Sequence, residues 1–374
     1  MSVLEIIIVF VSCLYFLLLA WFFKGIASLP YFVKDNDVPK TKFSIIIPFR
    51  NEAENLPNLI ETLLELNYPK HLFEILFIND DSKDNSVNII KSFAIENATI
   101  IDSERHSLSP KKDAITTAIK YAKNNWIITT DADCFLPKAW LLTYDSFITK
   151  NHPKMIVAPV SYVANNTFLE QFQLFDFLSL QSATHASFGI KKPILCNGAN
   201  FAYQTTIFKE LSGFEGNNNI ASGDDIFLLE KMTKKYPNEL HYLKNKDALV
   251  YTLPQKTLKD LIHQRIRWAS KTSASNNTFT KIVGIIIFTM NALIIATLIL
   301  SITGVLTSNF FITILLLKGV IDYMFIKKSA DIFQQAFCLR HYLLSCLMYP
   351  AFSTVIVLST YLFNYKWKDR MFKK

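Results

Sequence analysis

The chain is poor in glycine, with 9 among 374 residues, and it lacks a glycine-rich phosphate-binding loop of the Walker type. That absence argues against the P-loop classes of nucleotide-binding enzyme. No internal repeat or low-complexity linker occurs. The 5 cysteines have no metal-ligand spacing and at least two lie in apolar runs, so we expect reduced, structural thiols at Cys13, Cys134, Cys196, Cys338 and Cys346.

Apolar residues make up 51% of the chain and gather at its two ends. Residues 3–23 form an almost unbroken apolar run, close to the ~20 residues with which a helix crosses hydrocarbon. The run lacks a basic start and a small-residue cleavage site, which predicts a retained anchor and not a signal peptide. Apolar runs return at residues 282–303, 310–326 and 341–363, so at most four crossings are expected.

The charges around these runs predict a topology. Glu5 lies in the first apolar run, and Lys24, Lys34, Lys40 and Lys42 follow it. The positive-inside rule then predicts that the middle of the chain lies in the cytoplasm. We expect an integral membrane protein, of a bacterial plasma membrane. The net charge is +8, but Lys and Arg are dispersed through the middle and concentrate beside apolar segments and in the tail at 366–374. This distribution favours membrane lipids over nucleic acid as a partner.

The C-terminal runs raise a conflict with the same rule. An outside N-terminus followed by an anchor and three crossings would leave the basic tail outside. We therefore expect one run to lie in the interface or to re-enter. The candidates are the run at 310–326, which Lys318 and Asp322 interrupt at a spacing that lets them pair, and the run at 341–363, which contains Pro350.

Between the apolar ends the pattern is that of a soluble α/β domain. Short β-branched runs and amphipathic stretches alternate at an interval that predicts a mainly parallel, doubly wound sheet, with ligands beyond the carboxyl ends of its strands. The predicted strands lie at residues 43–48, 73–78, 98–101 and 126–130, and the predicted helices at 54–66, 86–93 and 114–122. The expected domains are an anchor at 1–24, the α/β domain at 42–280, membrane or interfacial helices at 281–365 and a basic tail at 366–374.

Acidic residues follow two of the predicted strands. Asp80 and Asp81 follow the second, and Asp131 and Asp133 follow the fourth. Both pairs would face one crevice, where carboxylates repel one another unless a cation is present. A hard divalent ion, Mg2+ or Mn2+, held by one or two carboxylates with phosphate oxygens and water, is expected. The alternative is that these residues cap helices or form turns.

Two further patterns lie downstream. Asp224 and Asp225 precede a helix predicted at 226–232, and an N-cap explains one of them better than both. The segment 264–268, Gln-Arg-Ile-Arg-Trp, places two guanidinium groups and an indole before the apolar run at 282–303. Arginine forks bind phosphate and an indole packs on sugars, although such residues also anchor membrane helices at the interface.

The motifs occur in a fixed order, as follows: Ile45-Ile46-Ile47-Pro48-Phe49-Arg50-Asn51-Glu52, Asn79-Asp80-Asp81-Ser82, Asp131-Ala132-Asp133, Gly223-Asp224-Asp225 and Gln264-x-x-Arg267-Trp268. Together they resemble the family 2 inverting glycosyltransferases, which include cellulose, chitin and hyaluronan synthases and ceramide glucosyltransferase. The resemblance covers about residues 43–270. It implies a GT-A fold, dependence on Mg2+ or Mn2+, and a nucleotide-sugar donor, with a UDP-sugar favoured.

The resemblance also implies roles for the donor-binding residues. Asp80 and Asp81 match the acidic pair that contacts the base and ribose, and Lys111 matches a lysine near the diphosphate. Asp131 and Asp133 match the D-x-D motif, with Asp133 the closer metal ligand. One departure concerns the turn after the acidic pair, where the family usually has glycine and then serine. Here Ser82 follows directly, which predicts a different turn and leaves the base open.

The acceptor side is implied in the same way. Asp225, beside Asp224, matches the proposed general base, and Asn197 and Gly198 resemble a loop near the acceptor. The remaining motif is expected to close over the acceptor and the donor diphosphate, with Arg267 on the diphosphate. Its members are Gln264, Arg267 and Trp268.

We expect the acceptor to be membrane-associated and lipid-linked. The interior polar residues of the apolar runs, chiefly Asn291, Lys318 and Asp322, are too few to line a sugar channel. A processive polysaccharide synthase of the same family is the alternative. A metal-dependent nucleotidyl or phosphoryl transferase is the rival from another class, and a non-catalytic scaffold is a third interpretation.

Overall fold

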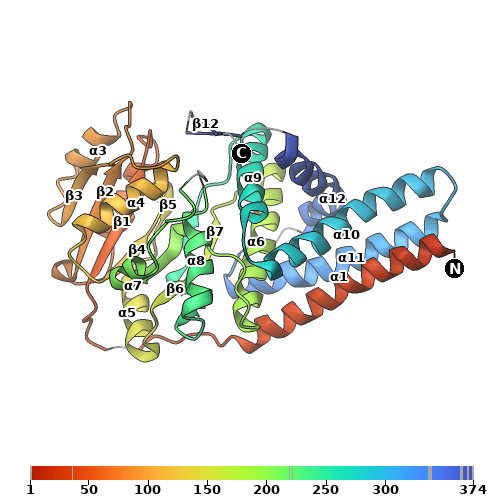
Figure 1. Cartoon of the computed structure of the whole chain (residues 1–374), viewed down its shortest axis with the longest axis horizontal. Coiled ribbons are helices and arrows are strands. Elements are labelled where there is room, and N and C mark those ends of the chain that lie inside the picture. The colour runs from red at the N-terminus through yellow and green to blue at the C-terminus, as the bar shows by residue number, and fades with distance from the viewer. Residues whose placement is uncertain are drawn as a thin grey trace. The chain divides into compact units, whose positions relative to one another are not determined.

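A computed structural model describes residues 2–35, 37–218, 220, 222–335, 339–362, 365–368 and 370–372. Cys338, Phe363, Lys373 and Lys374, which the sequence analysis used, lie outside this range. The chain divides into two compact units. The sheet unit comprises Pro30–Val163 and Leu195–Leu253, and the helical unit comprises Met1–Leu29, Ala164–Ile194 and Pro254–Lys374. Figure 1 shows the elements of both.

The sheet unit is built on a seven-stranded sheet with the order β3-β2-β1-β4-β8-β6-β9. The four strands predicted from the sequence form its parallel half, which confirms a mixed α/β fold with a mainly parallel sheet. The antiparallel β8 joins that half to β6, which pairs in parallel with β9. The bounds are β1 (Phe43–Phe49), β2 (Phe73–Asn79), β3 (Ala98–Asp102), β4 (Trp126–Thr129), β6 (Met155–Val157), β8 (Phe201–Gln204) and β9 (Leu240–Tyr242).

A smaller sheet and short helices complete this unit. The small sheet has the order β5-β10-β7, with β5 (Cys134–Phe135), β7 (Val160–Tyr162) and β10 (Val250–Thr252). The helices are α2 (Leu56–Leu64), α3 (Ser86–Ser92), α4 (Pro110–Tyr121), α5 (Trp140–Asn151), α7 (Thr205–Glu210) and α8 (Asp224–Lys235). Short 3-10 turns are η1 (Lys70–Leu72), η2 (Gly198–Asn200) and η3 (Lys246–Ala248).

Helix α4 begins four residues before the predicted start at 114. Pro110 occupies its first turn, where the missing N–H costs no intrahelical hydrogen bond and the fixed φ suits a helix. The earlier start places Lys111, Lys112 and Asp113 on the first turn of the helix. These three side chains shape the site described below.

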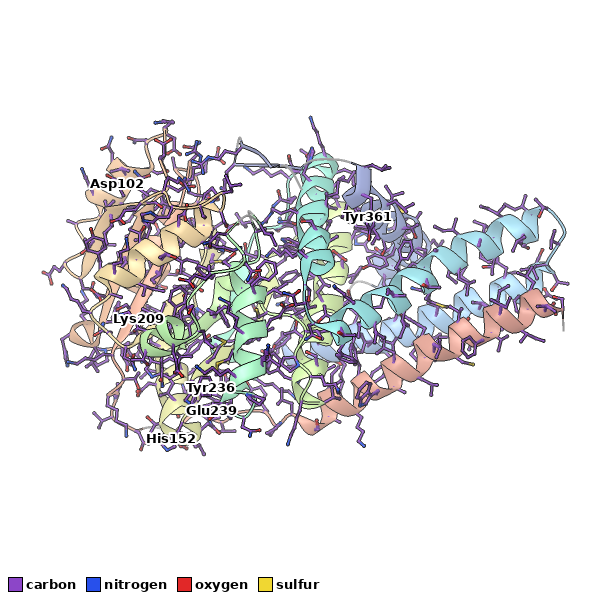
Figure 2. The ribbon with its side chains drawn as sticks, viewed as in Figure 1. Asp102, His152, Lys209, Tyr236, Glu239 and Tyr361 are labelled. Atoms are coloured by element: carbon purple, nitrogen blue, oxygen red, sulfur yellow. The ribbon has the colours of Figure 1, made fainter. Side chains whose placement is uncertain are left out.

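The helical unit contains four helices that are long and apolar enough to cross a membrane, by length and composition. They are α1 (Val3–Ser28), α10 (Thr278–Ile302), α11 (Ser308–Ile332) and α12 (Leu339–Leu362), and they contain the four apolar runs of the sequence. Figure 1 shows α1, α10 and α11 side by side, and Figure 2 shows mostly carbon atoms in their side chains. The unit also contains α6 (Phe168–Gly189), α9 (Leu258–Ala274) and the hairpin of β11 (Tyr365–Trp367) and β12 (Arg370–Phe372).

Helices α6 and α9 belong to the helical unit, although both lie within the range 42–280 that was expected for the α/β domain. Helix α6 packs on α1 where two glycines meet: a Cβ on Gly189 would lie 1.9 Å from the Gly25 carbonyl oxygen. The Ser28 hydroxyl donates to the Gly189 carbonyl at 3.0 Å. Small residues allow this backbone contact, which is a common way for helices to associate in membranes.

Candidate active site

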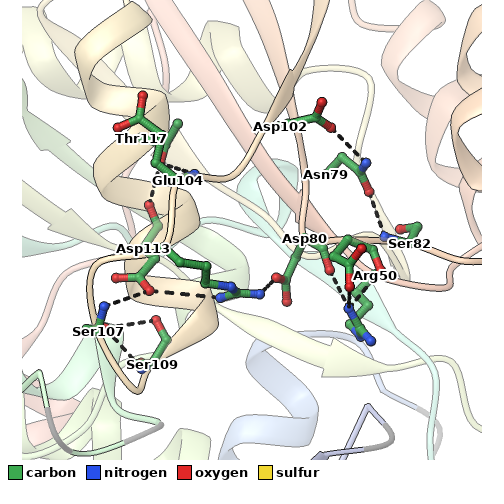
Figure 3. A network of polar contacts seen from close by, with 12 residues as sticks. Arg50, Asn79, Asp80, Ser82, Asp102, Glu104, Ser107, Ser109, Asp113 and Thr117 are labelled. Atoms are coloured by element: carbon green, nitrogen blue, oxygen red, sulfur yellow. Dashed lines mark hydrogen bonds and ion pairs between the residues drawn. The ribbon is translucent and has the colours of Figure 1, made fainter.

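The predicted site residues of the sheet unit come from the carboxyl ends of β2 and β4 and from the first turns of α4, η2 and α8. The acidic pair after β2 is held by Arg50, which follows β1. The Arg50 Nη1 atom donates to the Asp80 and Asp81 carbonyls, both at 2.7 Å. Figure 3 shows this network. The Asp80 side chain is buried and that of Asp81 is exposed.

The turn after the acidic pair forms without the glycine that the family usually has at this place. Asp81 itself adopts the left-handed conformation, with φ of 58°, which aspartate tolerates better than most residues. The Ser82 backbone N–H donates to Asn79 Oδ1 at 3.0 Å, and the Ser82 hydroxyl accepts from the Asn51 N–H at 3.2 Å. The Lys83 ammonium, 2.5 Å from Asp81 Oδ1, lowers the pKa of Asp81.

Arg105 was not predicted, and it pairs with the Asp80 carboxylate. Its other end lies 3.9 Å from Asp113 Oδ2, which also accepts from the Ser107 N–H at 3.1 Å. The signal in the sequence is its position, because Arg105 follows β3 and so reaches the same edge of the sheet as the residues after β2. A cation at that edge offsets the repulsion expected among the carboxylates.

Lys111 joins two of the three acidic clusters. Its Nζ atom lies 2.6 Å from Asp131 Oδ1 and 3.5 Å from Asp224 Oδ2. Burial lowers the pKa of Lys111, but the carboxylates of Asp131 and Asp224 raise it by more, so the net shift is well above the ordinary value. Lys111, which is expected near the donor diphosphate, therefore places a positive charge between the D-x-D motif and helix α8.

Asp224 and Asp225 form the first turn of α8, and Gly223, with φ of 89°, is its N-cap. The alternative that one aspartate is the N-cap is therefore wrong. Asp225 Oδ1 accepts from the Ile226 N–H at 2.8 Å, and Oδ2 accepts from the Gly198 N–H at 3.2 Å. Both contacts fix the orientation of a buried carboxylate.

The loop with Asn197 and Gly198 fits closely against this cluster. A Cβ on Gly198 would lie 3.0 Å from Asp224 Oδ2 and 3.3 Å from Lys111 Nζ, so a side chain there would press on both groups. Asn197 Oδ1 accepts from the Ala199 N–H at 3.0 Å and starts η2. The fully buried Asn200 fixes the end of this loop through hydrogen bonds with Trp140, Tyr144, Pro159 and Ala248. The sequence alone does not predict this supporting role of Asn200.

Asp131 and Asp133 fit the predicted metal site, which the donor would complete. The Asp131 carbonyl accepts from the Cys134 N–H at 3.2 Å, which closes the turn, and the Asp131 side chain is 37% exposed. Within the described part of the chain, no group of three or more His, Cys, Asp or Glu side chains is placed to hold a metal ion. Two carboxylates with diphosphate oxygens and water are a usual set of ligands for Mg2+ or Mn2+.

The motif with Gln264, Arg267 and Trp268 lies on α9 in the helical unit. Arg265 is buried there: its Nε donates to Asp176 Oδ2 at 2.5 Å, and its guanidinium lies 4.2 Å from the centre of the Trp268 ring. Of the two arginines in this motif, Arg265 and Arg267, the first thus forms an ion pair with Asp176 inside the helical unit. The roles of Gln264, Arg267 and Trp268 stay predictions.

Comparison with known proteins decides the family. Residues 44–212 match the model of glycosyl transferase family 2. This part of the chain is a family 2 glycosyl transferase domain. The matched range includes the acidic pair after β2, Lys111, the D-x-D motif and the Asn197 loop, and it ends before Asp224.

Two curated relatives illustrate what the chain is similar to. It is 26% identical over 117 residues to the poly(ribitol-phosphate) beta-N-acetylglucosaminyltransferase TarS of Staphylococcus aureus, a match that covers 31% of this chain and 20% of the relative. It is 34% identical over 93 residues to the undecaprenyl-phosphate 4-deoxy-4-formamido-L-arabinose transferase of Shewanella sediminis, covering 24% and 28%. The chain spans about a fifth of the length of the first curated relatives that it matches.

A solved structure supports the fold of the chain. The mannosyltransferase PcManGT from Pyrobaculum calidifontis, in complex with GDP-Man and Mn2+, matches with a TM-score of 0.60 at 16% identity. The match covers 96% of this chain and 99% of that one. The GT-A fold predicted from the motifs is confirmed.

The position of Asp225 generates a prediction. Asp225→Asn keeps the size of the side chain but removes its basicity, so kcat should fall by roughly 10²–10⁴-fold while the KM for the donor stays near that of the wild type. Asp247→Asn, at an exposed carboxylate paired with Lys34 in the same unit, is the control and should change neither constant. Steady-state kinetics measures both. A rise in KM with unchanged kcat would contradict the role of general base.

Proposed function

We propose that the chain is an inverting glycosyltransferase that moves a sugar from a nucleotide-diphosphate sugar to a lipid-linked acceptor, with Mg2+ or Mn2+. The observation that carries this proposal is the pair of contacts made by Lys111. One ammonium group joins the residue expected beside the diphosphate, Asp131, to the helix that carries the expected base, at Asp224. The Lys111 ammonium would thus lie between the groups that bind the donor and the helix that carries the expected base.

The chemistry follows from these groups. The acceptor hydroxyl attacks the anomeric carbon on the face opposite the diphosphate, so the carbon–oxygen bond to the diphosphate breaks as the new glycosidic bond forms and the configuration inverts. Asp225 accepts the hydroxyl proton, and the nucleoside diphosphate leaves. Lys111 stabilises the charge of the leaving group. A divalent ion held by Asp131 and Asp133 would supply further positive charge there. A UDP-sugar is the favoured donor.

A lipid-linked acceptor is favoured over a polymer passed through the bilayer. The polar groups expected inside the apolar runs are paired with one another: Lys318 Nζ lies 2.5 Å from Asp322 Oδ2, as predicted, and the Tyr15 hydroxyl donates to Asp322 Oδ1 at 2.5 Å. Asn291 is buried, and its amide donates to the Ile287 carbonyl at 3.0 Å. Side chains held in this way do not offer the free polar surface that a sugar channel needs.

The relatives agree with this choice in one respect. The Shewanella sediminis relative is named as an undecaprenyl-phosphate transferase, and undecaprenyl phosphate is a lipid carrier. The four apolar helices could anchor the chain in the membrane that holds such an acceptor. The rival nucleotidyl transferase differs in its product, because it would release pyrophosphate and not a nucleoside diphosphate.

Sizing the product tests the acceptor. Membranes containing the chain are incubated with labelled donor and then extracted with organic solvent. Transfer of one or a few sugars to lipid predicts a small labelled product in the organic phase, which disappears in the Asp225→Asn variant. A ladder, or a high-mass polysaccharide that resists lipid extraction, would instead establish a processive synthase.

The topology proposal concerns α12. Contacts with α6 and α9 extend along this helix from His341, against Phe168, to Ile356, against Ile266. Tyr349, near the middle, donates to Asp176 of α6 at 2.9 Å. Helices α6 and α9 carry charged residues that suit the interface better than hydrocarbon. We therefore place α12 at the interface and let α1, α10 and α11 cross, which puts the basic tail in the cytoplasm.

Cysteine labelling tests this topology in a cysteine-free background. With three crossings, Lys374→Cys should react with an impermeant thiol reagent only after the membrane is permeabilised. Val305→Cys, at an exposed position between α10 and α11, should react from outside and serves as the matched control. Labelling of Lys374→Cys in intact cells would show that α12 crosses as well.

A further inference from the structure

Lys112 is the feature that the proposed chemistry leaves unexplained. Its side chain is 1% exposed, although lysine is rarely buried without a partner. The Nζ atom donates to the carbonyls of Asn217 at 2.7 Å and Ile220 at 2.9 Å, and it lies 4.8 Å from the centre of the Phe227 ring. The charge is thus directed at a loop of the sheet unit and at helix α8.

That loop, residues 211–223, of which the structure describes all but 219 and 221, lies between α7 and α8 in the chain and ends directly before Asp224. Its first carbonyls, from Leu211, Gly213 and Glu215, accept hydrogen bonds from Lys231 Nζ at 3.2, 2.8 and 2.9 Å. Lys231 belongs to α8, so these bonds hold the loop to the helix that follows it. Lys112 binds the later part of the loop and ties it to α4, which lies on the donor side of the site.

The same lysine reaches the start of α8 through Phe227. A Cβ on Gly223 would lie 2.7 Å from the Phe227 ring, so this ring packs against the backbone at the N-cap of α8 and also faces Lys112. The neighbouring Lys111 contacts Asp224 directly. Two consecutive lysines therefore hold the Asp224-Asp225 turn, one by its carboxylate and the other by the loop and the ring next to it.

We infer that Lys112 is a positioning residue, which holds loop 211–223 and the first turn of α8 so that Asp225 faces the acceptor. The inference rests on the proposed function in one respect, the role of Asp225 as proton acceptor. Lys112 itself touches neither donor nor acceptor in this scheme. Its loss should therefore slow the transfer step and loosen the loop, without weakening the binding of the nucleotide.

The test compares the purified full-length protein with Lys112→Met, Lys112→Arg and the control Lys120→Met. Lys120 lies on the same helix, is half exposed and pairs with Glu104. The readouts are hydrogen–deuterium exchange of residues 211–223, kcat, and the Kd of a nucleoside diphosphate with Mn2+. Exchange is measured without substrate, so it reports on the loop even if sugar transfer itself were not observed.

Lys112→Met should speed exchange in residues 211–223 and lower kcat at least tenfold, with the Kd within twofold of the wild type. Lys112→Arg keeps a cationic donor and should recover part of both losses, and Lys120→Met should resemble the wild type. If Lys112→Met does not fold, Lys112→Gln, which keeps one neutral donor, takes its place with the same expectations. Unchanged loop exchange, or a Kd that rises as much as kcat falls, would overturn the inference.

Discussion

Repulsion among carboxylates at one edge of the parallel sheet is the constraint on which the site depends. Asp80, Asp131 and Asp224 come from three separate parts of the chain, and each is paired with a cation either from the loop before α4 or from the first turn of α4. Arg105 pairs with Asp80, and Lys111 pairs with the other two. Removing Lys111 would be costly because the buried Asp224 carboxylate would be left in low dielectric without that cation. These pairs therefore hold the site together and also supply its electrostatic field.

Helix α4 directs charged side chains to several parts of the site, because consecutive residues of a helix point in directions about 100° apart. From its first turn, Lys111 reaches the D-x-D motif and α8, Lys112 reaches the loop before α8, and Asp113 reaches Arg105 and so Asp80. One turn of helix thus contacts the regions expected to bind the base, the diphosphate and the acceptor. A start at Pro110, and not at residue 114, is what makes this arrangement possible.

Local sequence patterns predicted most of the fold. The features that were not predicted depend on contacts between residues that are distant in the sequence. The four parallel strands were predicted because runs such as Ile45 to Ile47 are buried on both faces and β-branched. Arg105 was missed because its partner lies 25 residues earlier in the chain, beyond any helical or strand periodicity. Helix α6 falls within the α/β domain expected at 42–280, but it belongs to the helical unit. Its partners, Gly25 of α1 and Arg265 of α9, are remote in sequence.

The central claim is that the acidic edge of the sheet binds a divalent ion and a nucleotide-sugar and releases a nucleoside diphosphate on transfer. It is tested most directly by assaying that release from a panel of donors, with Mg2+, with Mn2+ and with chelator, for the wild type and for folded Asp133→Ala. The account predicts metal-dependent release of nucleoside diphosphate by the wild type and none by the variant, since Asp133 would be a metal ligand. Full activity of folded Asp133→Ala, or pyrophosphate as the product, would contradict it.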